Sequence, residues 1–209
     1  MLELCDIELG FDAGALFSGL NLTIAPGEIC LLTAPSGAGK SSLLRWMAGL
    51  ETPGLHASGQ VKLGEHILSE LPAERRQLGL LFQTPQIFPH LTVADNLGFG
   101  LVPSITGTAR TNAIADALDK AGLAGMGLRD PQTLSGGQQA RLALLRTLLA
   151  QPQALLLDEP FSSLDGVRRE EMVKLVLEEA VERKLPVLLV SHDPRDEGLA
   201  DKPPYRLGA

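Results

Sequence analysis

The chain has 209 residues, of which 44% are hydrophobic and 21% are charged, a balance typical of one folded domain and not of a disordered segment. Its formal net charge of −7 argues against a duplex-binding surface, which is normally basic, so no nucleic-acid partner is expected. A membrane-spanning helix needs about 20 consecutive apolar residues, and no stretch of the sequence is that long and apolar. The start, "MLELCDIEL", is acidic and unlike a secretory signal, which makes a cytosolic location the default expectation.

The predicted elements begin with strands. Alternating apolar residues predict half-exposed strands over 1–11 and 19–24. The continuous apolar run "EICLLTA", residues 28–34, predicts a fully buried strand that ends in a Gly/Ser/Pro loop. After that loop, apolar residues at helical spacing predict a helix that begins after Lys40 and stops at Gly49, and further strands are expected at 59–64 and 78–83.

The pattern becomes helical from about residue 92, with helices predicted over 92–101, 108–123 and 136–150. Buried strands follow at 154–160 and 185–192, separated by an amphipathic helix over 167–184. Buried strands that alternate with helices imply a parallel α/β core. We therefore predict a single domain, 1–209, in which 1–83 and 151–209 form the α/β core with a β subdomain and 84–150 is an inserted helical subdomain.

One loop is close to a phosphate-binding loop. The stretch "LLTAPSGAGKSS" fits G-x-x-x-x-G-K-[ST] except that Ala34 replaces the first glycine. Such a strand–loop–helix unit directs backbone N–H groups and the positive end of the helix dipole at phosphate. Lys40 would reach the β- and γ-phosphates, and the Ser41 hydroxyl would hold Mg²⁺. The alternative is a Gly/Ser turn followed by an incidental lysine. The predicted nucleotide contacts of this loop are Ser36, Gly37, Ala38, Gly39, Lys40, Ser41 and Ser42.

Two further motifs accompany the loop. "ALLLDEP" ends a buried strand in two carboxylates, where Asp158 would hold Mg²⁺ and Glu159 would act as general base toward the attacking water. Upstream, Ser135, Gly136, Gly137 and Gln138 open a helix and offer a second anion site. Two anion sites in one chain suggest that two copies enclose the nucleotide. The alternative is a serine N-cap followed by flexible glycines.

With "LSGGQ", the chain resembles the ATP-binding-cassette ATPases that power membrane transporters, over nearly its whole length and with the motifs in the expected order. The resemblance implies an α/β fold, namely a P-loop NTPase core with a mostly parallel sheet, an N-terminal antiparallel β subdomain and an inserted α-helical subdomain. It also implies ATP and Mg²⁺ as ligands. It assigns γ-phosphate and Mg²⁺ sensing to Gln83, and contact with the γ-phosphate and the attacking water to His192.

Two assignments from the resemblance concern other parts of the nucleotide. Asp165 ends the "SSLD" loop that would cross the dimer interface. Phe11 lies where an aromatic ring stacks on adenine, although Phe17 is close by and either ring could belong to the core. The catalytic residues implied in this way are Lys40, Gln83, Glu159 and His192, and the metal ligands are Ser41, Gln83 and Asp158.

The implied mechanism is a head-to-tail homodimer that closes on two MgATP and drives a transmembrane permease subunit. The permease would dock near Gln83 and the helical subdomain, at the cytoplasmic face of the inner membrane. We expect the ATP-hydrolysing subunit of a transporter for a small solute, more like an importer. Two alternatives remain: a non-transport ATPase acting on a soluble macromolecular partner, and a degenerate regulatory subunit. Only Ala34 favours a degenerate regulatory subunit. The catalytic residues that argue against it are all present: Lys40, Asp158, Glu159 and His192.

Some predictions lie outside these motifs. After the histidine that corresponds to His192, the family usually continues with a strand, a helix and a further strand pair. Only residues 193–209 follow His192 here, which puts a regulatory role in doubt. Cys5 and Cys30 are expected to be buried free thiols. The other histidines are expected to be surface residues without identifiable partners; they are His56, His66 and His90.

Overall fold

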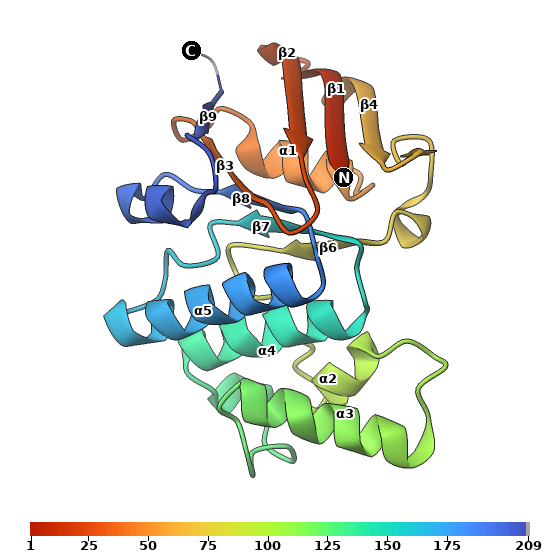
Figure 1. Ribbon diagram of the computed structural model, residues 1–209, viewed down its shortest axis with the longest axis vertical. Helices are drawn as coiled ribbons and strands as arrows, with labels where there is room; N and C mark the ends of the chain where they lie inside the picture. Colours follow the sequence, from red (N-terminus) through yellow and green to blue (C-terminus); the bar gives the residue numbers. More distant parts are fainter. Residues whose placement is uncertain (208–209) are drawn as a thin grey trace. The chain divides into compact units, whose positions relative to one another are not determined.

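The computed structural model describes residues 1–207, so residues 208 and 209 of the predicted core lie outside it. The chain forms two compact units. The first comprises Met1–Leu80, Gln153–Glu159 and the described residues from Leu175 onward; the second comprises Leu81–Pro152 and Pro160–Lys174. The predicted subdomain boundaries, 83/84 and 150/151, stay predictions. Figure 1 shows the order of the elements along the chain.

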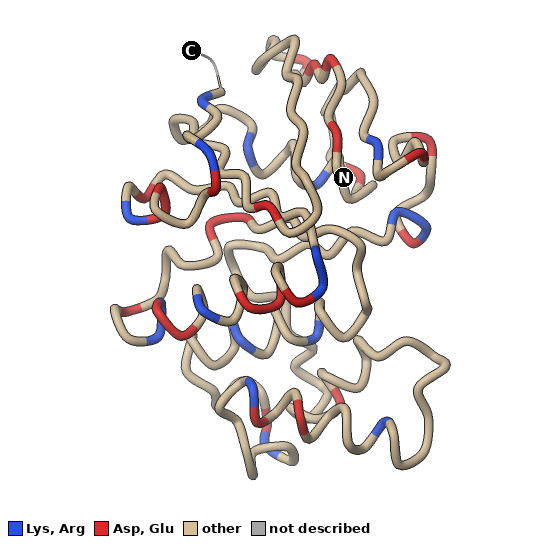
Figure 2. Tube along the Cα trace, in the orientation of Figure 1, with Lys and Arg blue, Asp and Glu red and all other residues tan. Residues whose placement is uncertain are grey.

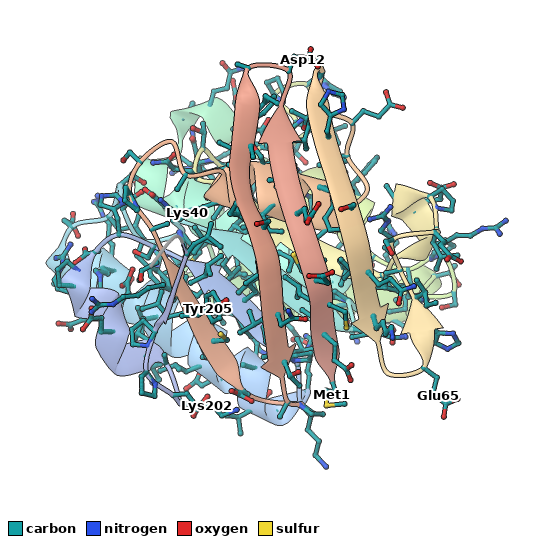
Figure 3. All side chains as sticks on the ribbon, turned by 90° about the horizontal axis from the view of Figure 1, so that it is seen from above. Met1, Asp12, Lys40, Glu65, Lys202 and Tyr205 are labelled. Carbon is teal, nitrogen blue, oxygen red and sulfur yellow. The ribbon has the colours of Figure 1, made fainter. Side chains whose placement is uncertain are left out.

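The first unit contains an antiparallel sheet with strand order β2-β1-β4-β5. Its strands are β1 (Leu2–Phe11), β2 (Gly14–Ile24), β4 (Leu55–Leu63) and β5 (His66–Ile67). Figure 3 shows β1 between β2 and β4, with Asp12 at the tip of the β1–β2 turn. Leu2 pairs with Ile24 and with Leu63, and these alternate apolar side chains face the core. The sheet is the predicted N-terminal β subdomain.

The same unit contains a parallel sheet with strand order β6-β7-β8-β3-β9. Its strands are β6 (Leu78–Leu81, whose last residue is in the second unit), β7 (Ala154–Asp158), β8 (Val187–Val190), β3 (Ile29–Thr33) and β9 (Tyr205–Arg206). Every residue of β7 and β8 is buried, as continuous apolar runs predict. Parallel pairing of β7 with β8 and of β8 with β3 brings the carboxyl ends of three strands to one edge.

Helix α1 (Lys40–Met47) follows β3 and shares one hydrophobic core with both sheets. Its fully buried Leu43 and Leu44 belong to the same cluster as Leu4 of β1 and Leu156 of β7. Burial of such side chains stabilises the fold by about 1.5–3 kcal/mol each. The core thereby fixes the direction of α1, whose first turn follows the phosphate loop.

The second unit is helical. It contains α2 (Val93–Gly100), α3 (Gly107–Lys120), α4 (Gly136–Leu149) and the first half of α5 (Gly166–Glu182). Helix α2 packs on both α3 and α4. Figure 2 shows both signs of charge along α3 and α5. Buried Met172, Leu175 and Val176 alternate at helical spacing with exposed residues of α5, as predicted for an amphipathic helix. Residues 1–207 also include three short 3₁₀ helices, of which only the second lies in this unit: η1 (Ala73–Arg75), η2 (Pro131–Thr133) and η3 (Pro194–Leu199).

Several sequence-based predictions were wrong in extent. Strands β2 and β4 begin earlier than predicted, at Gly14 and Leu55, because their first halves become strand by pairing with β1. The short strands β5 and β9 were not predicted, and β9 adds a fifth strand beside β3. Cys5 and Cys30 are free but only half-buried. Over residues 1–207, no helix is long and apolar enough to cross a membrane.

Candidate nucleotide site

The loop between β3 and α1 has the backbone of a phosphate cradle. Gly37 and Gly39 have φ values of 83° and 89°, in the left-handed region that favours glycine. The Lys40 ammonium donates to the carbonyl oxygens of Ala34 at 2.8 Å and of Pro35 at 3.1 Å, and Lys40 is only 7% exposed. The loop therefore holds one cation beside the first turn of α1, where the helix dipole is positive.

Ala34 does not disturb this loop. Positive φ values at described non-glycine residues occur only at Asp6, Gln77, Gln151, Glu159 and Lys184. Ala34 therefore has a backbone conformation that any residue adopts. Its side chain is half-buried and packs against the hydrophobic core of the first unit. A methyl group at this position lies against apolar neighbours, so the departure from the glycine pattern costs little.

Side chains of β2 form a wall of the loop, which sequence reasoning missed. A Cβ at Gly39 would lie 2.6 Å from Leu16 Cδ1 and 3.5 Å from Phe17 Cε1. Phe17 packs against the core, and it also lines, together with Phe11 at the end of β1, a surface pocket of about 410 Å³. No sequence pattern marks Leu16 as a neighbour of the loop, because a single leucine in a β-hairpin usually packs in the core. The approach of β2 to the loop is a tertiary feature.

Two of the three histidines expected to lack a partner have one. His56 Nε2 in β4 lies 2.5 Å from Asp12 Oδ1 in the β1–β2 turn, although both side chains are largely exposed. That expectation is wrong for His56. It is also wrong for His90, whose ring centroid lies 6.1 Å from that of Phe88. His66 and His90 are both exposed, as predicted.

Asp158 and Ser41 place a carboxylate and a hydroxyl side by side. Asp158 ends β7, is 6% exposed, and is hydrogen-bonded to the Ser41 side chain. Burial raises the pKa of Asp158 and the Glu159 charge adds to this, while the Ser41 hydrogen bond and the Lys40 charge act in the opposite direction. One carboxylate with one hydroxyl fits Mg²⁺, which usually takes one or two protein oxygens and completes its shell with phosphate and water. In the described part of the chain, no group of three or more His, Cys, Asp or Glu side chains could hold a metal by itself.

Glu159 and His192 lie together at the same sheet edge. Glu159 Oε1 is 2.7 Å from His192 Nδ1, and the two side chains are 13% and 58% exposed. The contact arises because β7 and β8 are parallel neighbours, with Asp158 beside Val190. Glu159 has a φ of 46°, and its N–H donates to the Val190 carbonyl at 2.9 Å. Strained backbone of this kind is concentrated at functional sites.

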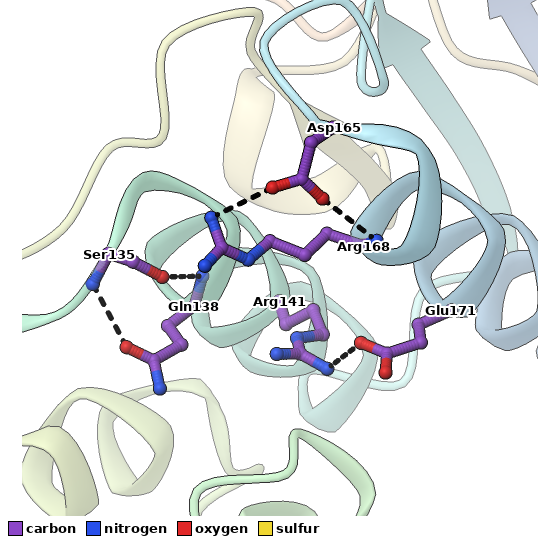
Figure 4. A network of polar contacts seen from close by, with 6 residues as sticks. All are labelled: Ser135, Gln138, Arg141, Asp165, Arg168 and Glu171. Atoms are coloured by element: carbon purple, nitrogen blue, oxygen red, sulfur yellow. Dashed lines mark hydrogen bonds and ion pairs between the residues drawn. The ribbon is translucent and has the colours of Figure 1, made fainter.

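In the second unit, Ser135 caps α4. The Ser135 N–H donates to Gln138 Oε1 at 2.9 Å, and the Gln138 N–H donates to Ser135 Oγ at 3.4 Å, which is a capping box (Figure 4). The predicted alternative, a serine N-cap, is therefore correct as local structure. It leaves the exposed Gly136 at the positive helix end. Asp165 Oδ1 accepts from the Arg168 N–H at 3.2 Å.

The family model described as "ABC transporter" matches residues 17–162. The chain belongs to the ABC transporter family. The "Uncharacterized ABC transporter ATP-binding protein YnjD" of Escherichia coli (strain K12) is 43% identical over 196 residues, covering 94% of this chain and 90% of that protein. The thiamine import ATP-binding protein ThiQ of Cereibacter sphaeroides is 46% identical over 83% of this chain and 74% of its own length. The Fe(3+) ions import ATP-binding protein FbpC of Rhizobium etli is 41% identical, and the match spans 54% of that longer protein.

Solved structures agree with this assignment. The dimeric structure of MJ0796, described as a bacterial ABC transporter cassette, superposes with a TM-score of 0.85 at 26% identity, covering 100% of this chain and 97% of that chain. A dimeric post-hydrolysis state of the same cassette, bound to ADP and Pi, gives a TM-score of 0.83 at 25% identity, with the same coverage. These likenesses confirm the predicted P-loop NTPase fold and the assignment as an ATPase.

The ABC ATPase distributes the predicted site residues over its two units. Those within the first unit are Phe11, the loop Ser36–Ser42, Asp158, Glu159 and His192. Those within the second unit are Gln83, which is exposed just after β6, Ser135–Gln138 and Asp165. The structure thus brings Lys40, Ser41 and Asp158 together, and Glu159 with His192.

Proposed function

We propose that this ABC ATPase is the peripheral ATP-hydrolysing subunit of a membrane importer for a small solute, acting at the cytoplasmic face of the inner membrane. The observation that carries the proposal is the Glu159–His192 pair at the sheet edge that also holds Asp158 and its bonded Ser41. Similar proteins are named as import ATP-binding proteins for thiamine, Fe(3+) ions and 2-aminoethylphosphonate. They do not favour the alternative of a non-transport ATPase.

Different residues bind the phosphates, hold the metal ion and activate the attacking water. The loop N–H groups and Lys40 bind the phosphates of ATP. Ser41 and Asp158 would hold Mg²⁺, with Gln83 as a further ligand, and the bound ion would neutralise charge on the phosphates. Glu159 accepts a proton from water while the water oxygen bonds to the γ-phosphorus and the bond to the bridging oxygen breaks. His192 orients Glu159 and contacts the γ-phosphate.

Two copies complete the site in this proposal. The first turn of α4, Ser135–Gln138, of one copy would face the γ-phosphate held by the loop of the other, with Asp165 crossing between them. Support comes from the exposed helix end at Gly136 and from the two dimeric cassette structures. Phe11 would stack on adenine. ATP then favours the closed pair and hydrolysis releases it, because the contacts to the γ-phosphate exist only before hydrolysis.

The permease would dock on the second unit near Gln83. Phe99 is 68% exposed and its ring lies 4.6 Å from that of Phe88, which in turn carries the Arg146 guanidinium at 4.5 Å. Phe88 and Arg146 are half-buried beneath Phe99, and aromatic and arginine side chains are enriched at protein interfaces. The segment from Gln83 to Phe99 therefore presents a surface suited to a membrane partner.

The test is Glu159→Gln, which preserves side-chain size and the hydrogen bond to His192. A positioned general base contributes about 10²–10⁴-fold, so phosphate release should fall by at least about 10²-fold while an ATP-bound pair accumulates. The matched control is Glu182→Gln, an exposed residue at the end of α5. Hydrolysis by Glu159→Gln at the parent rate would show that the general base is another group.

The transport assignment has its own test. The Glu159→Gln chain, purified from native membranes with ATP, should carry a polytopic membrane protein in stoichiometric amount. A soluble macromolecular partner in its place would refute the importer and leave the ATPase intact.

A further inference from the structure

Arg168 lies against the first turn of α4, Ser135–Gln138, which we call the signature turn. No motif includes Arg168. It is the third residue of α5, and its side chain crosses Gly137 in the first turn of α4. A Cβ at Gly137 would lie 2.8 Å from Arg168 Cδ and 3.6 Å from Arg168 Cβ. Gly137 is buried while Gly136 remains exposed. The aliphatic stem of Arg168 is therefore part of the surface around the positive end of α4.

The guanidinium of Arg168 is held only loosely. Its Nη1 lies 3.2 Å from Asp165 Oδ2, and the two side chains are 48% and 60% exposed. Figure 4 shows the side chain extending from α5 toward Asp165, in the neighbourhood of Ser135 and Gln138. An exposed ion pair of this kind contributes little to stability, because both charges remain solvated. The guanidinium can therefore exchange Asp165 for another anion at small cost.

The neighbouring cations have other partners. Arg141 Nη1 is 2.6 Å from Glu171 Oε2, and the Arg169 guanidinium lies 5.6 Å from the Phe161 ring centroid. Arg168 is thus the cation of this surface that pairs with the loop residue predicted to cross between two copies.

We propose that Arg168 is a further phosphate-binding residue, whose guanidinium leaves Asp165 and contacts the terminal phosphate of the ATP held by a second copy. This inference rests on the two-copy arrangement proposed above. Guanidinium–phosphate hydrogen bonds are charge-assisted and can be bidentate, and they strengthen when water is excluded. The exchange also leaves Asp165 Oδ2 available to the partner surface, while Oδ1 keeps its hydrogen bond from the Arg168 N–H. ADP lacks the terminal phosphate, so Arg168 favours pairing with ATP over pairing with ADP.

The test compares variants in the Glu159→Gln background. Each chain is titrated with MgATP, and the dimer fraction is measured by light scattering after size exclusion. Arg168→Gln should raise the ATP concentration for half-maximal pairing by about tenfold or more, the loss expected for a hydrogen bond to a charged group. Arg168→Lys keeps the charge without the planar fork and should rescue part of this loss. The matched control is Lys174→Gln, which removes one exposed charge from the same helix.

Two further readouts separate a phosphate contact from a structural role. MgATP binding to dilute, unpaired chains and the melting temperature without nucleotide should be the same for Arg168→Gln and Lys174→Gln. Equal ATP concentrations for pairing in these two variants would overturn the role of Arg168 and leave the proposed function intact. A Glu159→Gln parent that binds MgATP and never pairs would overturn the two-copy arrangement, and the inference with it.

Discussion

Arg76 anchors the end of the helix that carries the phosphate site. The side chain is 7% exposed and donates to four backbone carbonyl oxygens: Leu71 and Trp46 at 2.8 Å, Met47 at 2.9 Å and Ser69 at 3.2 Å. Trp46 and Met47 form the last turn of α1, where the dipole favours a cation. A Cβ at Gly49 would lie 2.8 Å from Arg76 Nε, so the absence of a side chain at Gly49 makes room for the guanidinium.

We expect Arg76→Met to destabilise the chain by roughly 2–6 kcal/mol. Each of the four hydrogen bonds contributes about 0.5–1.5 kcal/mol net, and their loss leaves carbonyl oxygens without a donor. This is a large part of a typical stability of about 5–15 kcal/mol. Arg76→Lys should lose less, because an ammonium can reach some of the same oxygens.

Urea unfolding followed by tryptophan fluorescence measures this loss. Trp46 is the single tryptophan of the chain and its own carbonyl accepts from Arg76, so the signal reports on the affected helix. Arg75→Met, at the exposed neighbouring position, is the control and should change stability by less than about 0.5 kcal/mol. A loss below about 1 kcal/mol for Arg76→Met, equal to the control, would refute the anchoring role.

Two other predictions follow from the structure. Ala34→Gly should change ATP affinity by less than about tenfold, roughly 1.4 kcal/mol, because the methyl group packs on the core; calorimetric titration checks this, and a larger gain would mean that the methyl obstructs the loop. Burial raises the pKa of the Cys30 thiol to about 11, so in a Cys5→Ser chain its alkylation at pH 8 should be about 10²-fold slower than that of an ordinary thiol and should keep accelerating to pH 10. A rate that levels off near pH 9 would contradict that environment.

Much of the fold was predictable because its signals are local. The apolar runs of β3, β7 and β8 and the periodic helices α4 and α5 were found at nearly their observed bounds. The motifs lie at the ends of these elements, so a strand, a loop and a helix in sequence already place Lys40 at a helix start and Asp158 at a strand end. Residues that depend on long-range pairing were harder: β5 and β9 have two residues each and no pattern of their own.

The sequence by itself determined the chemistry offered by this protein: a cation in a glycine-rich loop, two carboxylates at a strand end and a capped glycine turn, since each depends on neighbours within a few residues. Only the tertiary structure decided what these groups meet. Parallel pairing of β7 with β8 places Glu159 beside His192, 33 positions away. The Ala34 methyl is tolerated because it packs against the hydrophobic core. The Arg168 side chain crosses Gly137 and so places a cation beside the first turn of α4. Contacts of this kind depend on packing between distant segments, which no local pattern contains.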